Sequence, residues 1–202
     1  MRLGAADYRK MPWKNGGGVT TEIVVEPPSG RLSDARFSYR VSVADVASDG
    51  PFSAFPGCDR HIMLLSGDGM TLDVDGTWHE LRAFAPFSFS GDARVHGALH
   101  GGPVRDFNVI VDRASFRATL TSQLVAANAP CTLSCPPGAT LLVYVIAGHL
   151  VGRYAAAPGE TLVLQEPALV AAHAVTSETG GTLARLAIAL LAPGESCDSS
   201  TQ

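Results

Sequence analysis

IMLLSGDG, residues 62–69, is the stretch that decides the fold, because it is an apolar strand that runs directly into a glycine-centred turn. A second apolar strand, residues 70–74, follows at once, and together they predict a β-hairpin. A similar stretch, LVYVIAGH, occupies residues 142–149, and Pro158-Gly159-Glu160 marks the strand that follows it. The recurrence of this unit in both halves predicts an internal duplication.

The rest of the chain has the same pattern. Apolar residues recur with period two or in short runs, and Gly, Pro, Asp or Ser interrupts them about every ten residues, which is typical of short antiparallel strands. No long amphipathic helix is predicted. The expected strands are residues 20–25, 37–44, 61–66, 70–74, 78–81, 87–90 and 107–111 in the first half, and 116–125, 131–134, 141–147, 149–154, 161–164, 169–172 and 183–191 in the second.

Repeated hairpins bury their strand edges best when the sheets close into sandwiches or barrels. We therefore predict an all-β fold of two stacked β-barrels. The first barrel is expected over residues 1–113 and the second over residues 114–194. Residues 195–202 are polar and lack periodicity, so we expect a disordered tail.

Composition limits the class of protein. With 202 residues, of which 46% are hydrophobic, the chain can bury a substantial core. A net charge of −4 without runs of Lys or Arg disfavours nucleic acid and anionic membranes as partners. The first residues do not resemble a secretory signal, and no apolar segment approaches the roughly 17 residues of a membrane helix. We expect a cytoplasmic protein whose four cysteines are free thiols.

A glycine block, MPWKNGGG, occupies residues 11–18. Three consecutive glycines are entropically costly, so a fold usually keeps them for tight backbone geometry or for close approach of a ligand. The alternative, a plain flexible turn, is favoured by the block alone, because no helix follows to bind a phosphate. The neighbouring Trp13, Lys14 and Asn15 favour a functional role.

Two strands carry polar side chains on one face. Arg40 and Ser42 alternate with apolar residues in the strand over residues 37–44, and small neighbours leave room for a carboxylate to reach the guanidinium. Asp106 and Asn108 likewise alternate with Phe107. These faces predict either a polar ligand-binding wall or, as the alternative, solvated outer surfaces.

The loop over residues 52–61 is rich in aromatic residues, Pro and Gly, and it delivers Arg60 and His61 to the start of a strand. Such loops often rim the mouth of a barrel. Alternatively, Asp59 and Arg60 form surface ion pairs and His61 is structural.

The chain lacks the usual pattern of a metal or nucleophile site. Its six histidines never occur one residue apart, and we expect the glycine-rich segment that contains His96 and His100 to be a loop. A Gly-x-Ser-x-Gly elbow is also missing. We predict no metal and no cofactor.

Four ordered blocks between residues 11 and 113 resemble the HutD/Ves family of bicupins: MPWKNGGGVTTEI, SYRVSVADVASDGPFSAFPGCDRHIMLLSGDGM, APFSFSGD and DFNVIVDR. The second half resembles the family mainly in its pattern of strands and glycines. The resemblance implies a tandem cupin fold, of the RmlC-like jelly-roll type, and an association with histidine utilisation. It also implies binding of a small anionic intermediate such as formylglutamate or urocanate, in a regulatory or sensing role.

Carried onto this sequence, the family motifs imply a ligand site that contains Asn15, Arg40, Arg60, His61, Asp106 and Asn108. We hypothesise that the arginines neutralise ligand carboxylates, that the asparagines orient its amide or imidazole group, and that Phe87 or Phe107 packs against its stem.

Two other classes of function stay open. The chain could be a cofactor-free enzyme with His61 or Asp106 as general acid or base. It could also be a structural protein that uses exposed sheet edges to form oligomers such as a homodimer.

Overall fold

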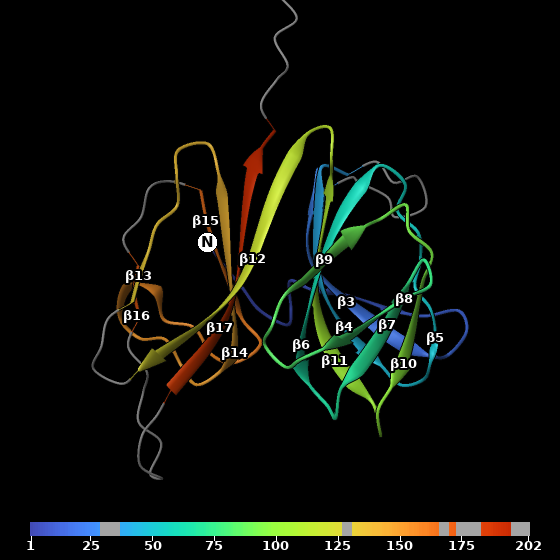
Figure 1. The fold of residues 1–202 in the computed structure, drawn as a ribbon. Coiled ribbons are helices and arrows are strands. Elements are labelled where there is room, and N and C mark those ends of the chain that lie inside the picture. The colour runs from blue at the N-terminus through green and yellow to red at the C-terminus, as the bar shows by residue number, and fades with distance from the viewer. Residues whose placement is uncertain (29–36, 127–130, 166–169, 173–182, 195–202) are drawn as a thin grey trace, which may run out of the picture.

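The computed structural model describes residues 1–28, 37–126, 131–165, 170–172 and 183–194. The predicted tail over residues 195–202, like the first residue of the strand predicted over 169–172, lies outside them. Within the described residues the fold is almost entirely β-strand, with one short 3-10 helix, η2 (Gly152–Tyr154) (Figure 1). The all-β prediction is confirmed.

The first half forms two sheets (Figure 1). One is six-stranded, in the order β2 (Arg9–Pro12), β3 (Gly18–Glu26), β4 (Tyr39–Val46), β11 (Val104–Asp112), β6 (Cys58–Ser66), β9 (Phe87–Ser90). The other is four-stranded, in the order β5 (Gly50–Pro51), β10 (Val95–Leu99), β7 (Met70–Val74), β8 (Thr77–Leu81). Apolar side chains of both sheets pack together between them, for example Ile62 and Leu64 with Met70 and Leu72. We call this half the first lobe.

The second half, which we call the second lobe, also forms two sheets. One is five-stranded, in the order β1 (Arg2–Leu3), β15 (Thr161–Leu164), β14 (Thr140–Ala147), β17 (Leu183–Pro193), β12 (Phe116–Ala126). The other pairs β13 (Cys131–Leu133) with β16 (Val170–Ala172). Strand β1 comes from the start of the chain, yet it pairs with β15, so the first residues contribute to the sheet of the second lobe.

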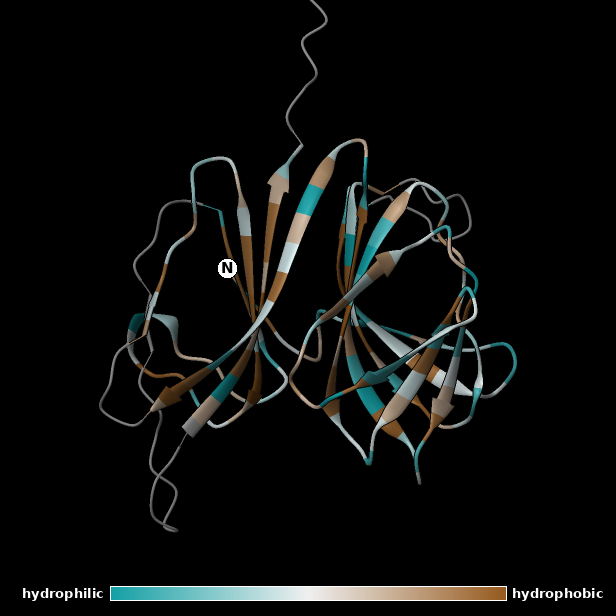
Figure 2. Ribbon diagram, viewed as in Figure 1, coloured by the Kyte–Doolittle hydropathy of each residue, from teal (hydrophilic) through white to brown (hydrophobic). Residues whose placement is uncertain are grey.

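An apolar layer joins the two lobes. Phe107 and Val109 on β11 are fully buried in one cluster with Leu142 and Tyr144 on β14. The rings of Phe107 and Tyr144 lie 5.5 Å apart between centroids. Strand β14 is largely hydrophobic along its length, whereas β12 alternates between hydrophobic and polar residues (Figure 2). Because successive side chains alternate, the residues between these on β11, such as Asn108, face the interior of the first lobe.

Two predicted elements differ from the structure. The segment over residues 149–154, expected to be a strand, contains η2, and Leu150 only bridges to Ala156. Gly152 has a φ of +80°, which turns the chain away from extended geometry. The segment around His96, expected to be a loop, is strand β10. Glycine suits position 97 of this strand because any larger residue would place its Cβ atom only 2.8 Å from Cε2 of Phe52.

No helix in the described ranges has the length and apolar character needed to cross a membrane.

Candidate functional site

A cavity of about 530 Å³ lies in the first lobe. Strands β3, β4, β6 and β11 supply most of its polar side chains, and β2, β5 and the turn or loop that follows each of them supply most of its apolar ones. Among the described residues it is lined by Met11, Pro12, Trp13, Lys14, Asn15, Thr20, Arg40, Ser42, Ala44, Pro51, Phe52, Ser53, Phe55, Arg60, Asp106, Asn108 and Ile110.

The glycine block forms the turn between β2 and β3, which places Trp13 and Asn15 at the cavity. Gly16 has a φ of +73°, and a Cβ atom on Gly18 would lie 2.5 Å from the carbonyl oxygen of Asp45. The indole Nε1 of Trp13 donates to Thr20 Oγ1 at 2.8 Å, and Oδ1 of Asn15 accepts from the backbone N–H of Gly17 at 3.0 Å. Gly18 therefore serves close packing, and Gly16 supplies a positive φ within the turn.

Arg40 lies on the cavity face of β4 and is 5% exposed, so the alternative of a solvated outer face is wrong for this residue. Its Nε donates to Oε2 of the buried Glu22 at 2.7 Å. The exposed Arg9 approaches Oε1 of the same carboxylate at 2.9 Å. Sequence reasoning missed Glu22, although it lies two residues after the cavity-lining Thr20 and therefore on the same face of β3. Nη2 of Arg40 is buried and has no partner among the described residues.

Arg60 is held in an aromatic cage. Its guanidinium carbon lies 5.5, 5.3 and 4.8 Å from the ring centroids of Phe52, Phe55 and Phe89. Its Nη1 donates to the backbone oxygen of Ser53 at 3.0 Å. Burial lowers the pKa of Arg60 to about 10, which leaves the group charged at neutral pH. Cation–π contact and one backbone acceptor thus partly replace the water that this charge has lost.

Asn108 links Arg60 to Asp106. Nη2 of Arg60 donates to Oδ1 of Asn108 at 3.3 Å, and Nδ2 of Asn108 donates to Oδ1 of Asp106. Asp106 is 0% exposed, and burial raises the pKa of its carboxyl to about 7, although the positive charge of Arg60 opposes the increase. The other carboxyl oxygen, Oδ2, is buried without a partner among the described residues.

Three buried polar atoms of the cavity lining thus have no hydrogen-bond partner within the described chain: Nη2 of Arg40, Nε of Arg60 and Oδ2 of Asp106. A buried polar atom without a partner costs about 1–3 kcal/mol, so a bound water or ligand is expected to satisfy such atoms. Two of these atoms belong to cations and donate N–H groups. The arrangement therefore suits an anionic ligand with hydrogen-bond acceptors.

A family model described as HutD matches residues 5–184. The chain belongs to the HutD family. This confirms the resemblance seen in the sequence and extends it into the second lobe.

Two relatives of this HutD-family chain come from bacteria. A Pseudomonas putida protein described as uncharacterised, 21.2 kDa and in the hutC 3' region is 48% identical over 119 residues, which cover 58% of this chain and 61% of the relative. Protein Ves of Citrobacter koseri is 40% identical over 117 residues, 55% of this chain and 59% of the relative. The chain thus matches about three fifths of the length of these curated relatives.

Solved structures match along almost the whole chain. A conserved Pseudomonas aeruginosa protein of unknown function has a TM-score of 0.81 at 34% identity, over 95% of this chain and 98% of that chain. HutD from Pseudomonas fluorescens, solved in a formate condition, has a TM-score of 0.74 at 31% identity, over 96% and 98% of the two chains. A cupin 2 conserved barrel protein from Leptotrichia buccalis, at 14% identity and a TM-score of 0.52 over 95% and 98% of the two chains, shows a cupin-like fold alone.

Three of the expected ligand-binding residues, His61 from the family motifs and Phe87 and Phe107 from the hypothesis about the ligand stem, do not line the cavity. Phe107 and His61 are sequence neighbours of Asp106 and Arg60, so strand alternation turns them to the opposite face of the sheet. There Phe107 is part of the layer between the lobes, and Nδ1 of His61 lies 2.7 Å from Oγ of Ser88.

The third is Phe87, which packs inside the first lobe but lies two residues before Phe89, the residue of β9 that is opposite Arg60. Phe87 pairs with Ile62 in the β6–β9 register, whereas Phe89 pairs with Arg60 and makes the cation–π contact. Sequence reasoning missed Phe89, although both phenylalanines belong to the quoted block APFSFSGD. The register between β6 and β9 decides which of the two phenylalanines contacts the guanidinium of Arg60.

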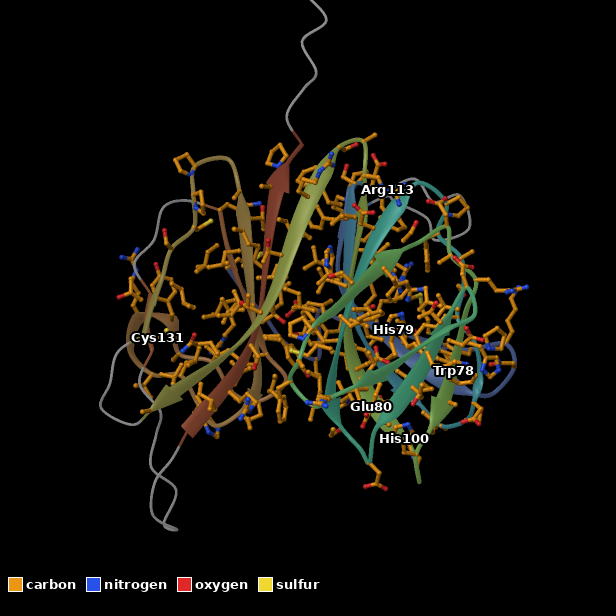
Figure 3. The ribbon with its side chains drawn as sticks, viewed as in Figure 1. Trp78, His79, Glu80, His100, Arg113 and Cys131 are labelled. Atoms are coloured by element: carbon orange, nitrogen blue, oxygen red, sulfur yellow. The ribbon has the colours of Figure 1, made fainter. Side chains whose placement is uncertain are left out.

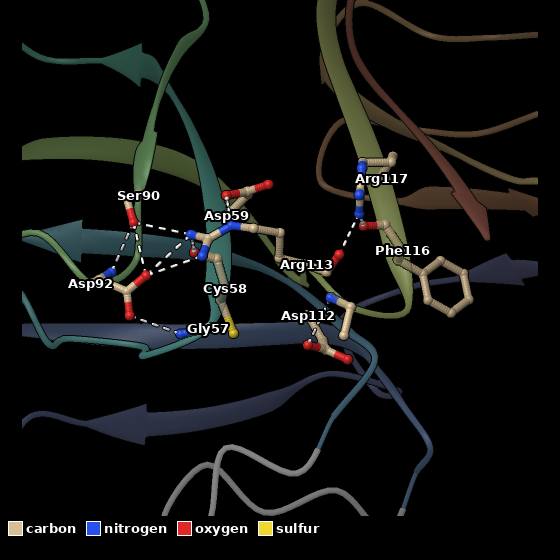
Figure 4. A network of polar contacts seen from close by, with 10 residues as sticks. Gly57, Cys58, Asp59, Ser90, Asp92, Asp112, Arg113, Phe116 and Arg117 are labelled. Atoms are coloured by element: carbon tan, nitrogen blue, oxygen red, sulfur yellow. Dashed lines mark hydrogen bonds and ion pairs between the residues drawn. The ribbon is translucent and has the colours of Figure 1, made fainter. Parts of the chain in front are cut away.

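An ion-pair network outside the cavity fixes the ends of its strands (Figure 4). Nε of Arg113, just after β11, donates to Asp59 at 2.7 Å, and Nη2 donates to the backbone oxygen of Cys58 at 2.8 Å. The same guanidinium lies 3.2 Å from Asp92. The expected alternative of surface ion pairs thus holds for Asp59, whose pair with Arg113 ties β11 to β6, but not for Arg60, which is 5% exposed.

Trp78, the most exposed aromatic side chain in the described part of the chain, does not line the cavity. Trp78 is 65% exposed and lies with His79 and Glu80 on β8, an edge strand of the four-stranded sheet (Figure 3). Within the described residues, no group of three or more His, Cys, Asp or Glu side chains is placed to hold a metal ion.

Proposed function

We propose that this HutD-family chain is a bicupin whose first lobe binds a small carboxylate of histidine utilisation, such as formylglutamate or urocanate, and that it acts in the cytoplasm as a regulator or sensor. The separate sheets and apolar cores of the lobes support the tandem cupin arrangement. The names of two relatives, hutC-region protein and HutD, support the connection with histidine utilisation.

The observation that carries the proposal is a pair of buried cations that present free N–H groups in one cavity. Nη2 of Arg40 and Nε of Arg60 have no partner in the described part of the chain. Asn15 and Lys14 lie at the exposed side of the same cavity, and Asn108 lines its interior. A planar guanidinium recognises a carboxylate by charge and geometry together, and apolar walls such as Phe52 exclude water.

Calorimetric titration with formylglutamate and with urocanate tests the proposal. We expect binding heat with the unchanged protein and a large loss of affinity in the double variant Arg40→Met, Glu22→Gln, which removes a cavity cation together with its buried counter-ion. Arg105→Ala is the matched control, because this arginine is 46% exposed and pairs with Asp45 outside the cavity lining. No binding of either acid to protein with an intact fold would refute the proposal.

A second function is favoured by one specific observation. Asp106 has a pKa raised to about 7 and a free Oδ2 in a cavity, which suits a general acid or base at neutral pH. We propose as the alternative that the chain is a cofactor-free enzyme that uses Asp106. Incubation with each acid followed by mass spectrometry separates the two functions, because a binding protein returns its ligand unchanged. His61 does not serve this alternative, since it faces away from the cavity.

A further inference from the structure

Asp106 is an unusual residue for a site that binds anions, because an ionised carboxylate there would repel the ligand. It is fully buried in the cavity wall on β11, the strand that pairs with β4 on one side and with β6 on the other. Its Oδ1 is occupied by the N–H donated from Asn108, whose orientation is fixed by Arg60. A proton on Asp106 would therefore lie on Oδ2, the oxygen that has no partner among the described residues.

The charges around Asp106 decide whether that proton is present. Strand β6 contributes Arg60, and β4 contributes Arg40 and, further out, Asp45. The charge of Arg40 is largely balanced by Glu22 of β3, to which it is bonded at 2.7 Å. Asp45 itself pairs with the exposed Arg105 at 2.8 Å. The nearest uncompensated charge facing Asp106 is thus Arg60.

An incoming carboxylate changes this balance. When its negative charge is placed against Arg40 and Arg60, it competes with Asp106 for Arg60. Two negative groups in one buried site cannot both ionise without a large cost, so one of them takes a proton. The ligand carboxylate has two guanidinium groups to hold its charge, whereas Asp106 is then left with neutral Asn108 alone.

We propose that the ligand anion enters this cavity together with one proton, which comes from solvent and forms the O–H bond on Oδ2 of Asp106. The inference rests on the proposed function, since it concerns the same anion. Asp106 is then a specificity residue, because the cavity binds a carboxylate tightly near and below neutral pH and more weakly above it. The burial that raises the pKa of Asp106 to about 7 places this change at neutral pH.

The proton is measurable by calorimetry. Formylglutamate is the probe, because its carboxyl groups stay ionised between about pH 6 and pH 8, whereas the imidazole of urocanate titrates near that range. Titrations in buffers of different ionisation enthalpy give the number of protons taken up per ligand. With a pKa of about 7 for the empty site, we expect about 0.9 proton at about pH 8 and about tenfold weaker binding at about pH 8 than at about pH 6.

Asp106→Asn assigns the proton. The amide is neutral at every pH, so this variant should bind formylglutamate with equal affinity at both pH values and without proton uptake. Asp68→Asn is the matched control, because this exposed aspartate lies in the turn between β6 and β7, outside the cavity lining, and should leave the uptake unchanged.

The outcomes separate the inference from the proposed function. Binding without proton uptake by the unchanged protein overturns the inference and leaves the function standing. Uptake that persists in Asp106→Asn assigns the proton to another group and also overturns the inference. Failure of formylglutamate, glutarate and acetate alike to bind the folded protein overturns both.

Discussion

Replacing Asp106 by Asn should remove a large part of the pH dependence of folding stability, even without a ligand. Burial raises the pKa of this carboxyl from 3.8 to about 7 in the folded chain. Below about pH 4 the group is neutral in both the folded and the unfolded state, and its contribution to stability is fully present. As the pH rises, the unfolded carboxyl ionises first, and this contribution is lost until the pH passes the folded value of about 7.

The size of the effect follows from the two pKa values. A pKa difference of one corresponds to about 1.4 kcal/mol, so the complete loss is about 4 kcal/mol at most. Between about pH 5 and pH 8 the expected part of that loss is about 3 kcal/mol. Asp106→Asn retains the shape of the side chain and an acceptor for Asn108, but it cannot ionise, so it avoids the loss.

Urea denaturation at the two pH values checks this prediction. The free energy of unfolding of Asp106→Asn, relative to that of the unchanged protein, should increase by about 3 kcal/mol from about pH 5 to pH 8, with unchanged denaturant slopes. Asp68→Asn should show no such trend, because its carboxylate is exposed. Parallel pH profiles for the unchanged protein and Asp106→Asn would show that the carboxyl is ionised in the folded cavity, contrary to the reasoning.

Three further substitutions test the site and its supports. Arg40→Ala should destabilise the fold by about 3–5 kcal/mol, because it leaves buried Glu22 with only an exposed partner. Adding Glu22→Gln should restore most of that loss in a double-mutant cycle of urea denaturations, and additive effects would argue against the buried pair. Phe107→Ala should lower the free energy of unfolding by about 3–5 kcal/mol in urea denaturation, because the ring is fully buried between the lobes. The folded fraction should keep its affinity for formylglutamate, and a loss of affinity would show that the ring reaches the ligand. Gly18→Ala should lower the free energy of unfolding by about 1–3 kcal/mol and weaken ligand binding, since its Cβ would lie 2.5 Å from a backbone oxygen. Gly50→Ala adds a carbon with no atom within 4 Å and should change that free energy by no more than about 0.5 kcal/mol, so equal effects of the two on thermal unfolding would contradict the packing argument.

Alternation along single strands was enough to predict several parts of the candidate site. Period-two patterning places Arg40 with Ser42, and Asp106 with Asn108, on one face of each strand, and both pairs line the cavity. The same rule, applied one residue further, predicts that His61 and Phe107 face away from Arg60 and Asp106. The family motifs had pointed to His61, and the hypothesis about the ligand stem to Phe107, but local geometry separates both residues from the cavity.

Contacts between strands could not be predicted in this way. Arg40 and Arg60 come from different strands, yet both lie opposite Ile110 of β11 in the sheet register, which brings two cations to one level of the cavity. Sequence alone gives no reason for Glu22 to meet Arg40 or for Phe89, rather than Phe87, to meet Arg60. These contacts depend on register, which is set by the pairing of whole strands.

The sequence by itself determined the all-β fold, the glycine turn and the faces of individual strands, because these follow from backbone sterics and from the two-residue period of a strand. Only the tertiary structure decided the electrostatics. Folding removes Asp106 from water, places Asn108 between it and Arg60, and closes aromatic rings over that arginine. The pKa of a carboxyl depends on the charges and solvent around it in three dimensions, and neighbours along the chain do not specify them.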